Sequence, residues 1–379
     1  MKAVAVFPEK REIKLIEHKE PKIVSPTEVK LRMLEVGICG TDKEIANFDY
    51  GTPPEGFDYL VIGHESLGEA VEVGPGVNHI KQGDLVVPMV RRPCPHVHCR
   101  ACQANRQDFC FTGDFTERGI KEAHGFMTEF IVDDERYMNV VPRELRPVAV
   151  LIEPLTIAEK ALAQVWQVQQ RLPWACPVIQ GSAASSEGAG YCHQAVVLGA
   201  GPVGILGAML LVAAGFETYV YSREPKPSQK ANLVESFGAK YVSSEAASVE
   251  QLAAQVGSID LVYEAVGASR LAFDMLKVIG PNSVFVFTGV PGRKAPIEVD
   301  TDFIMRSLVI NNQVVFGTVN AGREAFEAAT RDLGSFMTRW PDAVQSLVTG
   351  RYPVEAHLDL LLGKVGGIKN VIALDGASV

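Results

Sequence analysis

The stretch Ala195-Val196-Val197-Leu198-Gly199-Ala200-Gly201-Pro202-Val203-Gly204 decides the fold of this chain. An apolar run, typical of a buried strand, leads into a G-x-G-x-x-G motif, and a helical pattern of apolar residues follows over 203–214. The first glycine permits the tight turn, the second lets the backbone approach a pyrophosphate, and the third lets the helix lie close to the strand. A tight turn without ligand is the alternative. The context predicts a dinucleotide site that includes Gly199, Gly201, Pro202, Val203 and Gly204, with phosphate at the helix N-terminus.

Apolar runs and helical patterns alternate from this motif toward the C-terminus. Such alternation predicts a parallel, doubly wound sheet, and six strands match the two-halved dinucleotide-binding fold. The predicted strands cover residues 195–198, 218–221, 241–243, 260–265, 283–288 and 313–318, and the predicted helices cover 203–214, 228–237, 249–256 and 270–279.

The region before the motif is rich in short alternating runs bounded by turn residues. Strands are predicted at 28–35, 68–73, 84–87 and 126–132, and a helix at 154–168. Residues 172–191, rich in Ala, Ser, Gly and Pro, predict a loop at a domain boundary. The last part of the chain contains helical runs at 322–330 and 341–348 and an apolar run at 370–374. With 379 residues, the chain is expected to form two or three domains of α/β class.

Composition excludes several partners. Asp and Glu number 45 against 36 Lys and Arg, a net charge of −9, which argues against nucleic acid and anionic membranes. Residues 194–216 are uncharged over the length of a membrane span, but their glycines and Pro202 belong to the phosphate-loop pattern. The apolar run before Lys10 is too short for a secretory signal, so a cytoplasmic location is expected.

The end of the second predicted strand bears on the choice of cofactor. An NAD site usually carries Asp or Glu there for the ribose hydroxyls. This chain has Ser222-Arg223-Glu224, in which a hydroxyl and a guanidinium suit a 2′-phosphate. We therefore expect NADP, held by Ser222 and Arg223. Because Glu224 lies close by, use of NAD remains possible, and a solvated Arg223 is the alternative.

The cysteines indicate metal and not disulfides. Their number is seven, which is odd, and no export signal is visible. Cys94-x4-Cys99-x2-Cys102-x7-Cys110 supplies four soft ligands, and four thiolates close a zinc site against substrate, which makes it structural. His96 and His98 lie in the wide first gap, and either is an alternative to Cys94. Reduced thiols in a plain loop are the remaining alternative.

A second set of metal-binding residue types is dispersed along the chain. Cys39 stands between two glycines, His64 follows a short apolar run, and Glu153 begins the helix predicted after the β-rich region. Cys, His and Glu together can bind a catalytic zinc with one position open. Taken singly, each residue also has a structural explanation: a small buried thiol, a core histidine and a charge at a helix start.

In these motifs the chain resembles the zinc-containing medium-chain alcohol dehydrogenase superfamily. The order Gly-Ile-Cys-Gly-Thr-Asp (37–42), Gly-His-Glu (63–65), the cysteine loop, Glu-Pro (153–154) and the glycine motif matches over essentially the whole length. Within it, the chain is most similar to the archaeal-type glucose 1-dehydrogenases. The supporting stretches include Val90-Arg91-Arg92-Pro93, residues 106–110, 113–120, 125–127 and 222–225, Gly317-Thr318-Val319-Asn320 and Gly367-Ile368-Lys369.

The resemblance implies a domain layout and a set of ligands. A GroES-like catalytic domain would span 1–190, a Rossmann domain 191–319, and residues 320–379 would return to the catalytic domain. Cys39 and His64 would bind the catalytic zinc, with Glu153 direct or water-bridged and Glu65 a ligand in some states. Sugar would contact Thr41, Glu117, Glu153 and Asn320. The nicotinamide would be lined by Thr288, Gly289, Val290, Thr318, Val319 and Asn320, and Lys369 would help to bind cofactor.

The implied reaction is oxidation of the C1 hydroxyl of D-glucose, or of a close aldose, to the lactone with NAD(P)⁺, and Thr41 would relay the proton. The same machinery acting on a polyol, threonine or a primary alcohol is the nearest alternative. Others are a non-catalytic NADPH-binding protein and a zinc-free quinone or enoyl reductase. A homodimer or homotetramer is expected from the resemblance. The chain departs from the pattern of this family in two places. The first gap of its cysteine loop is wide, and residues 172–191 have no evident counterpart.

Overall fold

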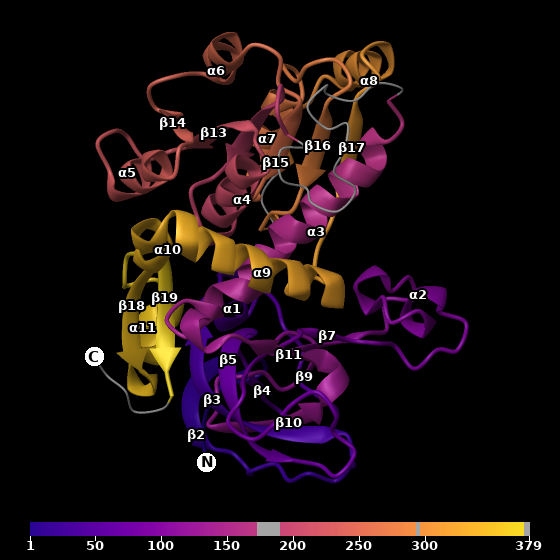
Figure 1. The fold of residues 1–379 in the computed structure, drawn as a ribbon, viewed down its shortest axis with the longest axis vertical. Coiled ribbons are helices and arrows are strands. Elements are labelled where there is room, and N and C mark those ends of the chain that lie inside the picture. Colours follow the sequence, from indigo (N-terminus) through magenta and orange to yellow (C-terminus); the bar gives the residue numbers. More distant parts are fainter. Residues whose placement is uncertain (173–189, 293–295, 375–379) are drawn as a thin grey trace. The chain divides into compact units, whose positions relative to one another are not determined.

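The computed structural model describes residues 1–172, 190–292 and 296–374, and these residues form two compact units. Unit 1 comprises Met1–Thr156 and Asn320–Val379, and unit 2 comprises Ile157–Val319 (Figure 1). Most of the loop predicted at 172–191 lies outside the described residues.

Unit 2 is built on a six-stranded, entirely parallel sheet with the order β14-β13-β12-β15-β16-β17. The order runs outward in both directions from β12, which is the arrangement of the two-halved dinucleotide fold, so the predicted fold class is confirmed. The strands are β12 (Gln194–Leu198), β13 (Glu217–Ser222), β14 (Lys240–Ser243), β15 (Leu261–Glu264), β16 (Val284–Phe287) and β17 (Val314–Gly317). The helices are α4 (Pro202–Ala213), α5 (Gln229–Ser236), α6 (Val249–Val256), α7 (Ser269–Met275) and α8 (Thr301–Ile310).

Local sequence explains where these elements begin. Pro202 occupies the first turn of α4, where its missing N–H costs no hydrogen bond. Ser248 caps α6 and forms a capping box with Gln251. The side chain of Asp300 accepts the N–H of Phe303 at the start of α8, a helix that the sequence analysis did not predict.

Gly204 lies where α4 approaches the loop that precedes it. A Cβ added at this position would stand 2.2 Å from the carbonyl oxygen of Gly199, well inside any real contact distance. The third glycine of the motif therefore has the packing role that the sequence predicts.

Helix α3 (Ile152–Gln169) begins in unit 1, and from Ile157 onward it belongs to unit 2. The reason is packing, because the apolar residues of α3 face α4 and the centre of the parallel sheet. These residues are Ala158, Ala161, Leu162 and Val165 on α3, facing Gly207, Leu210, Leu211, Leu261, Tyr263 and Val286. The predicted domain limits 1–190, 191–319 and 320–379 stay predictions.

Unit 1 contains three sheets. The largest has the order β11-β6-β5-β3-β19-β18, with β10 also paired to β3, and the smaller ones are β2-β1-β4 and β7-β8-β9. The strands are β1 (Lys2–Phe7), β2 (Glu12–Glu17), β3 (Glu28–Gly37), β4 (Leu60–Val61), β5 (Glu65–Val73), β6 (Leu85–Pro88), β7 (Arg91–Arg92), β8 (Thr116–Arg118), β9 (Glu122–Ala123), β10 (Phe130–Asp134), β11 (Met138–Val141), β18 (Val348–Pro353) and β19 (Lys369–Ala373). The α-helices wholly within unit 1 are α1 (Gly40–Ala46), α2 (Arg100–Gln103), α9 (Arg323–Arg339), α10 (Pro341–Leu347) and α11 (His357–Leu361).

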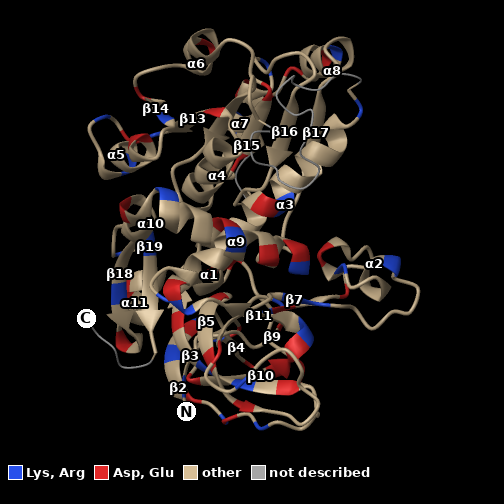
Figure 2. Ribbon diagram, in the orientation of Figure 1, with Lys and Arg blue, Asp and Glu red and all other residues tan. Residues whose placement is uncertain are grey.

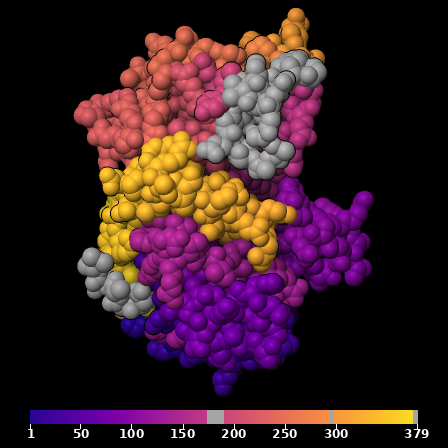
Figure 3. Space-filling view, in the orientation of Figure 1, coloured from indigo at the N-terminus to yellow at the C-terminus, as the bar shows by residue number. Residues whose placement is uncertain are grey.

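The C-terminal segment completes unit 1. Strand β19 pairs antiparallel with β3, and β18 pairs parallel with β19, so that residues more than three hundred positions apart share one sheet. The space-filling view shows this segment, in yellow, packed against the N-terminal part of the same unit (Figure 3).

The distribution of charged residues agrees with the net charge of −9. Acidic and basic residues alternate over the elements of both units, without a continuous basic stripe on the drawn ribbon (Figure 2). Among the described residues, no helix is both long and apolar enough to span a membrane. The uncharged segment 194–216 instead forms β12, the glycine turn and α4.

We predict that Gly204→Ala lowers the free energy of unfolding by about 1–3 kcal/mol, because the added methyl group overpacks the turn. Gly334→Ala in α9 is the control, since a Cβ there meets no atom within 4 Å. That variant should be neutral or slightly stabilising. Thermal melts of both proteins measure the effect, and equal melting temperatures would contradict the packing role of Gly204.

Candidate active site

Cys39 is positioned by the start of helix α1. It is the N-cap residue, and its backbone N–H donates to Oδ2 of Asp42 at 2.9 Å. Asp42 is completely buried, and Thr41 lies half-buried on the same first turn. The helix start therefore places a thiol, a hydroxyl and a carboxylate within one turn of chain.

His64 enters the same region from the turn between β4 and β5. Gly63 makes this turn with φ of +90°, and an added Cβ would stand 2.6 Å from Met127. Nδ1 of His64 lies 3.4 Å from Oδ1 of Asp42, and both atoms are buried without a hydrogen bond of ordinary geometry among the described residues. Burial by itself lowers the pKa of His64, but Asp42 and Cys39 raise it well above 6.5.

Two further acids and a lysine surround this pair. Glu65, the first residue of β5, forms a buried ion pair with Lys369 of β19, whose Nζ also donates to the carbonyl oxygen of Ile38 at 3.2 Å. Glu153, on the first turn of α3, has its pKa raised to about 7, mainly by burial and further by Glu65. Lys369 thus lies beside Glu65 in unit 1, and its contribution to cofactor binding stays a prediction.

This group fits a zinc ion. The ligand atoms of Cys39, His64 and Glu65 all lie within 4.8 Å of one another. A thiol, an imidazole and a carboxylate are the donor types that zinc prefers. Asp42 faces the second nitrogen of His64, as the carboxylate partner of a metal-binding histidine commonly does. The unpartnered buried atoms at Asp42 and His64 favour the same conclusion, because a bound cation compensates buried negative charge.

The cysteine loop forms a separate cluster in unit 1. The sulfurs of Cys94 and Cys102 are 3.7 Å apart, and those of Cys99 and Cys110 are 3.8 Å apart. All four sulfurs lie within 4.8 Å of one another. Four sulfurs at the usual distance of about 2.3 Å from one tetrahedral zinc would be separated by about 3.8 Å. The loop therefore has the geometry of a closed thiolate site, with no position left for substrate.

The geometry favours Cys94 over a histidine as the first ligand of this cluster. Cys94 is buried, whereas His96 is only half-buried and its Nε2 lies 2.7 Å from Oδ2 of Asp114. Burial raises the pKa of Cys110, but hydrogen bonds from Thr112 and from the backbone of the following residue outweigh it and lower the pKa to about 6. Such a thiol is readily deprotonated for metal binding.

Glu117 and Asn320, both predicted to contact sugar, are joined directly. Nδ2 of Asn320 donates to Oε1 of Glu117 at 3.0 Å, and both residues are buried. Asn320 has φ of +59°, a conformation that asparagine tolerates better than most residues. Among the described residues, no hydrogen bond links this pair to the metal-binding group, so their action on one substrate stays a prediction.

In unit 2, the predicted nicotinamide residues are held by Glu264 at the end of β15. Its carboxylate accepts the backbone N–H groups of Val266 at 2.9 Å, Gly267 at 2.6 Å and Gly289 at 3.2 Å. The hydroxyl of Thr288 donates to the carbonyl oxygen of Glu264 at 2.7 Å. One buried acid thus fixes two loops at the carboxyl end of the sheet, where ligands of this fold bind.

The third predicted segment of this site is held by α3. Nζ of Lys160 donates to the carbonyl oxygen of Val319 at 3.1 Å, and Nε2 of Gln164 donates to Oγ1 of Thr318 at 3.3 Å. Helix α3 therefore supports a loop that is predicted to line the cofactor.

The end of β13 carries the residues predicted to select the cofactor. Ser222 is the last residue of the strand, and Arg223 is exposed. Glu224 forms an ion pair with Lys230, so this acid is already engaged. Among the described residues, the guanidinium of Arg223 has no hydrogen bond or ion pair. This arrangement favours a 2′-phosphate over a free ribose hydroxyl.

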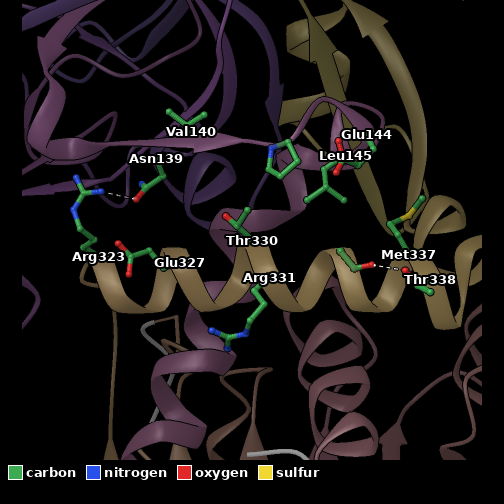
Figure 4. A pocket seen from close by; sticks show the side chains of 12 residues that line it. Asn139, Val140, Glu144, Leu145, Arg323, Glu327, Thr330, Arg331, Met337 and Thr338 are labelled. Atoms are coloured by element: carbon green, nitrogen blue, oxygen red, sulfur yellow. Dashed lines mark hydrogen bonds between the residues drawn. The ribbon is translucent and has the colours of Figure 1, made fainter. Parts of the chain in front are cut away.

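A cavity in unit 1 lies apart from these residues, and none of the predicted site residues lines it. It has a volume of about 790 Å³ and is bounded by α9 and the segment that follows β11 (Figure 4). Arg323 faces Asn139 across it, and Arg331 points away from it in this view. Its lining contains no thiol and no histidine.

Fold and site together define the class of zinc-containing medium-chain dehydrogenases. Residues 25–143 match the alcohol dehydrogenase GroES-like domain, and residues 146–374 match the glucose dehydrogenase C-terminus. The glucose 1-dehydrogenase of Methanocella arvoryzae is 36% identical over 99% of both chains, and that of Thermoproteus tenax is 37% identical over 98% of this chain and 99% of its own. The solved structure of Haloferax mediterranei glucose dehydrogenase, in complex with NADP, Zn and gluconolactone, is 33% identical with a TM-score of 0.85 over 100% of both chains. The chain belongs to the glucose dehydrogenase family.

Sequence reasoning missed three residues that organise these sites. Asp42 was visible in the motif, but its place between Cys39 and His64 depends on a separate strand. Glu264 could have been identified from the sequence, because it is an acidic residue at the end of an apolar strand. No signal in the sequence indicated the role of Arg91, which is bonded to Glu117, beyond the residues next to it in the chain.

We predict two zinc ions per chain, one in each cluster. Cys39→Ala should lose one ion and nearly all turnover while NADP still binds, because the nucleotide motif belongs to unit 2. Cys102→Ala should lose the other ion and melt at a lower temperature, because structural zinc contributes to folding. Elemental analysis and thermal melts measure both, with Cys192→Ala as the control thiol outside the clusters. A single zinc that Cys39→Ala retains would exclude the catalytic site.

Proposed function

We propose that this protein oxidises the C1 hydroxyl of D-glucose, or of a close aldose, to the lactone with NADP⁺. The observation that carries the proposal is the buried Glu117–Asn320 pair, in the same unit as the Cys39–His64–Glu65 metal group. A carboxylate and an amide held in this way suit a polyhydroxy substrate, because a sugar gives up many hydrogen bonds to water on binding. A simple alcohol would instead need an apolar pocket.

The proposed mechanism assigns each step to residues of this chain. When bound, zinc supplies a Lewis acid that polarises the C1 hydroxyl, and NADP⁺ supplies the hydride acceptor. Cys39 and His64 would hold the metal, with Glu153 as a direct or water-bridged ligand and Glu65, which pairs with Lys369, as a ligand in some states. Thr41 accepts the proton of the C1 hydroxyl and passes it toward solvent. Glu117 and Asn320 orient the remaining hydroxyls, and the products are the lactone, NADPH and one proton.

Further parts of the proposal concern the cofactor and the setting. NADP is the preferred cofactor and NAD a poorer one, and the thiolate cluster at Cys94, Cys99, Cys102 and Cys110 holds a structural zinc. Thr288, Gly289, Val290, Thr318 and Val319 line the nicotinamide. We place the enzyme in the cytoplasm as a homodimer or homotetramer.

We predict that wild-type protein reduces NADP⁺ with glucose far faster than with ethanol, threonine or a polyol. In the same assay, Glu117→Ala should raise the KM for glucose roughly 10- to 100-fold, the effect of losing about 1.5–3 kcal/mol in a charged hydrogen bond. Asn320→Gly keeps the left-handed backbone and removes only the amide, so that its smaller effect, about 0.5–1.5 kcal/mol, reports the lost bond alone.

Glu69→Ala is the control, since it also removes a strand glutamate from an arginine pair, here with Arg32. Its KM for glucose should match that of wild type. A wild-type preference for a simple alcohol, or an unchanged KM for every aldose in both site variants, would refute the glucose assignment. Bound NADPH without any turnover or zinc would indicate a non-catalytic binding protein.

A separate prediction concerns Arg223. Arg223→Ala should weaken NADP roughly 10- to 100-fold, because a guanidinium–phosphate contact is worth about 1.5–3 kcal/mol. NAD lacks the 2′-phosphate, so its KM should change little. Arg223→Asp should tilt the preference toward NAD, since it repels phosphate and accepts a ribose hydroxyl.

Measurement of kcat/KM with both cofactors decides this point. Lys226→Ala removes a nearby cation that is already paired with Glu235, and it should leave both values unchanged. If Arg223 only faces solvent, Arg223→Ala will lower the two values by similar small factors.

A further inference from the structure

Arg91 stands directly opposite Glu117 in the antiparallel pair of β7 and β8. Its Nε and Nη2 atoms both donate to Oε1 of Glu117, at 3.0 and 2.9 Å. Each side chain of the pair is only 7% exposed. Because little water screens it, this ion pair holds its geometry much more firmly than a surface pair would.

The rest of the guanidinium is fixed as well. Nη1 donates to the carbonyl oxygen of Asp108 at 3.3 Å, and the ring of Phe115 stacks at 3.7 Å from Cζ. Asp108 is itself held by two 3.0 Å bonds from Arg106 and lies two residues before Cys110. The cysteine loop thus supports Arg91 on the side away from Glu117. Each nitrogen of the guanidinium thus donates one hydrogen bond within the protein, and the side chain is buried.

The bonding of Glu117 is strongly asymmetric. Arg91 and Asn320 together direct three donors to Oε1. Among the described residues, no donor bonds to Oε2 of Glu117, and the side chain is only 7% exposed. A carboxylate that is saturated on one oxygen and without a partner on the other presents a single acceptor for hydroxyl groups.

We propose that Arg91 is a positioning residue for the substrate: it locks Glu117 so that Oε2 alone receives the sugar hydroxyls. This inference rests on the proposed function and adds a residue to it. Arginine is required because its planar fork delivers two N–H groups to one oxygen while a third reaches Asp108. A lysine keeps the charge but loses this geometry.

The test compares Arg91→Lys with Arg92→Lys. Arg92 is the next residue of β7, and it forms its own partly buried pair with Asp133 at 2.5 Å and stacks on Tyr137 at 4.3 Å. The two variants therefore carry the same substitution in two neighbouring ion pairs that water screens little. Only the first pair includes Glu117.

Arg91→Lys should raise the KM for glucose about tenfold, the effect of weakening one charged hydrogen bond to the sugar. Its kcat and its KM for NADP should change little, and its zinc content should equal that of wild type. Arg92→Lys should keep the KM for glucose even if its melting temperature falls as far. An unchanged KM in Arg91→Lys, or an equal rise in Arg92→Lys, would overturn the inference.

A double-mutant cycle then tests whether Arg91 acts through Glu117. In the Glu117→Ala background, Arg91→Lys should produce no further rise in the KM for glucose, because no carboxylate is left to position. Additive effects would show that Arg91 acts independently and would refute its positioning role.

Phe115→Leu covers the case in which Arg91→Lys does not fold. It removes only the ring that holds the guanidinium face, and it should raise the KM in the same direction by a smaller factor. An unchanged KM in that variant would count against the inference. Turnover of glucose by the wild-type protein distinguishes the two proposals. If the wild type does not oxidise glucose, the proposed function fails, and the role of Arg91 fails with it. If the wild type oxidises glucose but the variant has an unchanged KM, only the role of Arg91 is refuted.

Discussion

The burial of several acids around one thiol and one histidine is the constraint on which unit 1 depends. Asp42, Glu65 and Glu153 are all less than a tenth exposed, and burial of this much carboxylate is costly unless positive charge lies nearby. Lys369 pairs with Glu65, and Asp42 and Cys39 raise the pKa of His64. A metal ion held by these donors would likewise compensate their buried negative charge.

The C-terminal segment supplies residues that contact buried acids far away in the sequence. Strand β19 brings Lys369 to Glu65 over 304 residues, and Asn320 reaches Glu117 over 203 residues. The first contact depends on the pairing of β19 with β3, and both depend on the return of the chain to unit 1 after the parallel sheet. The interruption of unit 1 by unit 2 thus has a physical consequence, since neither polar group is complete before the chain has returned to unit 1.

Two acidic residues of unit 2 have different structural roles. Glu264 is buried and binds three backbone N–H groups, so it organises loops. Glu224 is paired with Lys230 beside the end of β13. With both acids engaged, the exposed Arg223 is the residue that we propose to contact the 2′-phosphate of the cofactor. These pairings support the proposed preference for NADP, whereas the net charge of the chain does not bear on it.

Contiguous motifs determined most of what was predicted correctly. The glycine turn, the alternating strands of unit 2 and the spacing of the four cysteines act over a few residues, so their physics can be read along the chain. The contacts of Cys94 with Cys102 and of His96 with Asp114, the support of the 318–320 loop by α3 and the packing of α3 in unit 2 were decided by the tertiary structure. So were the contacts of Asp42 with His64 and of Arg91 with Glu117. The reason is that side-chain partnership depends on strand register and helix packing, which bring distant residues together and leave no local pattern to read.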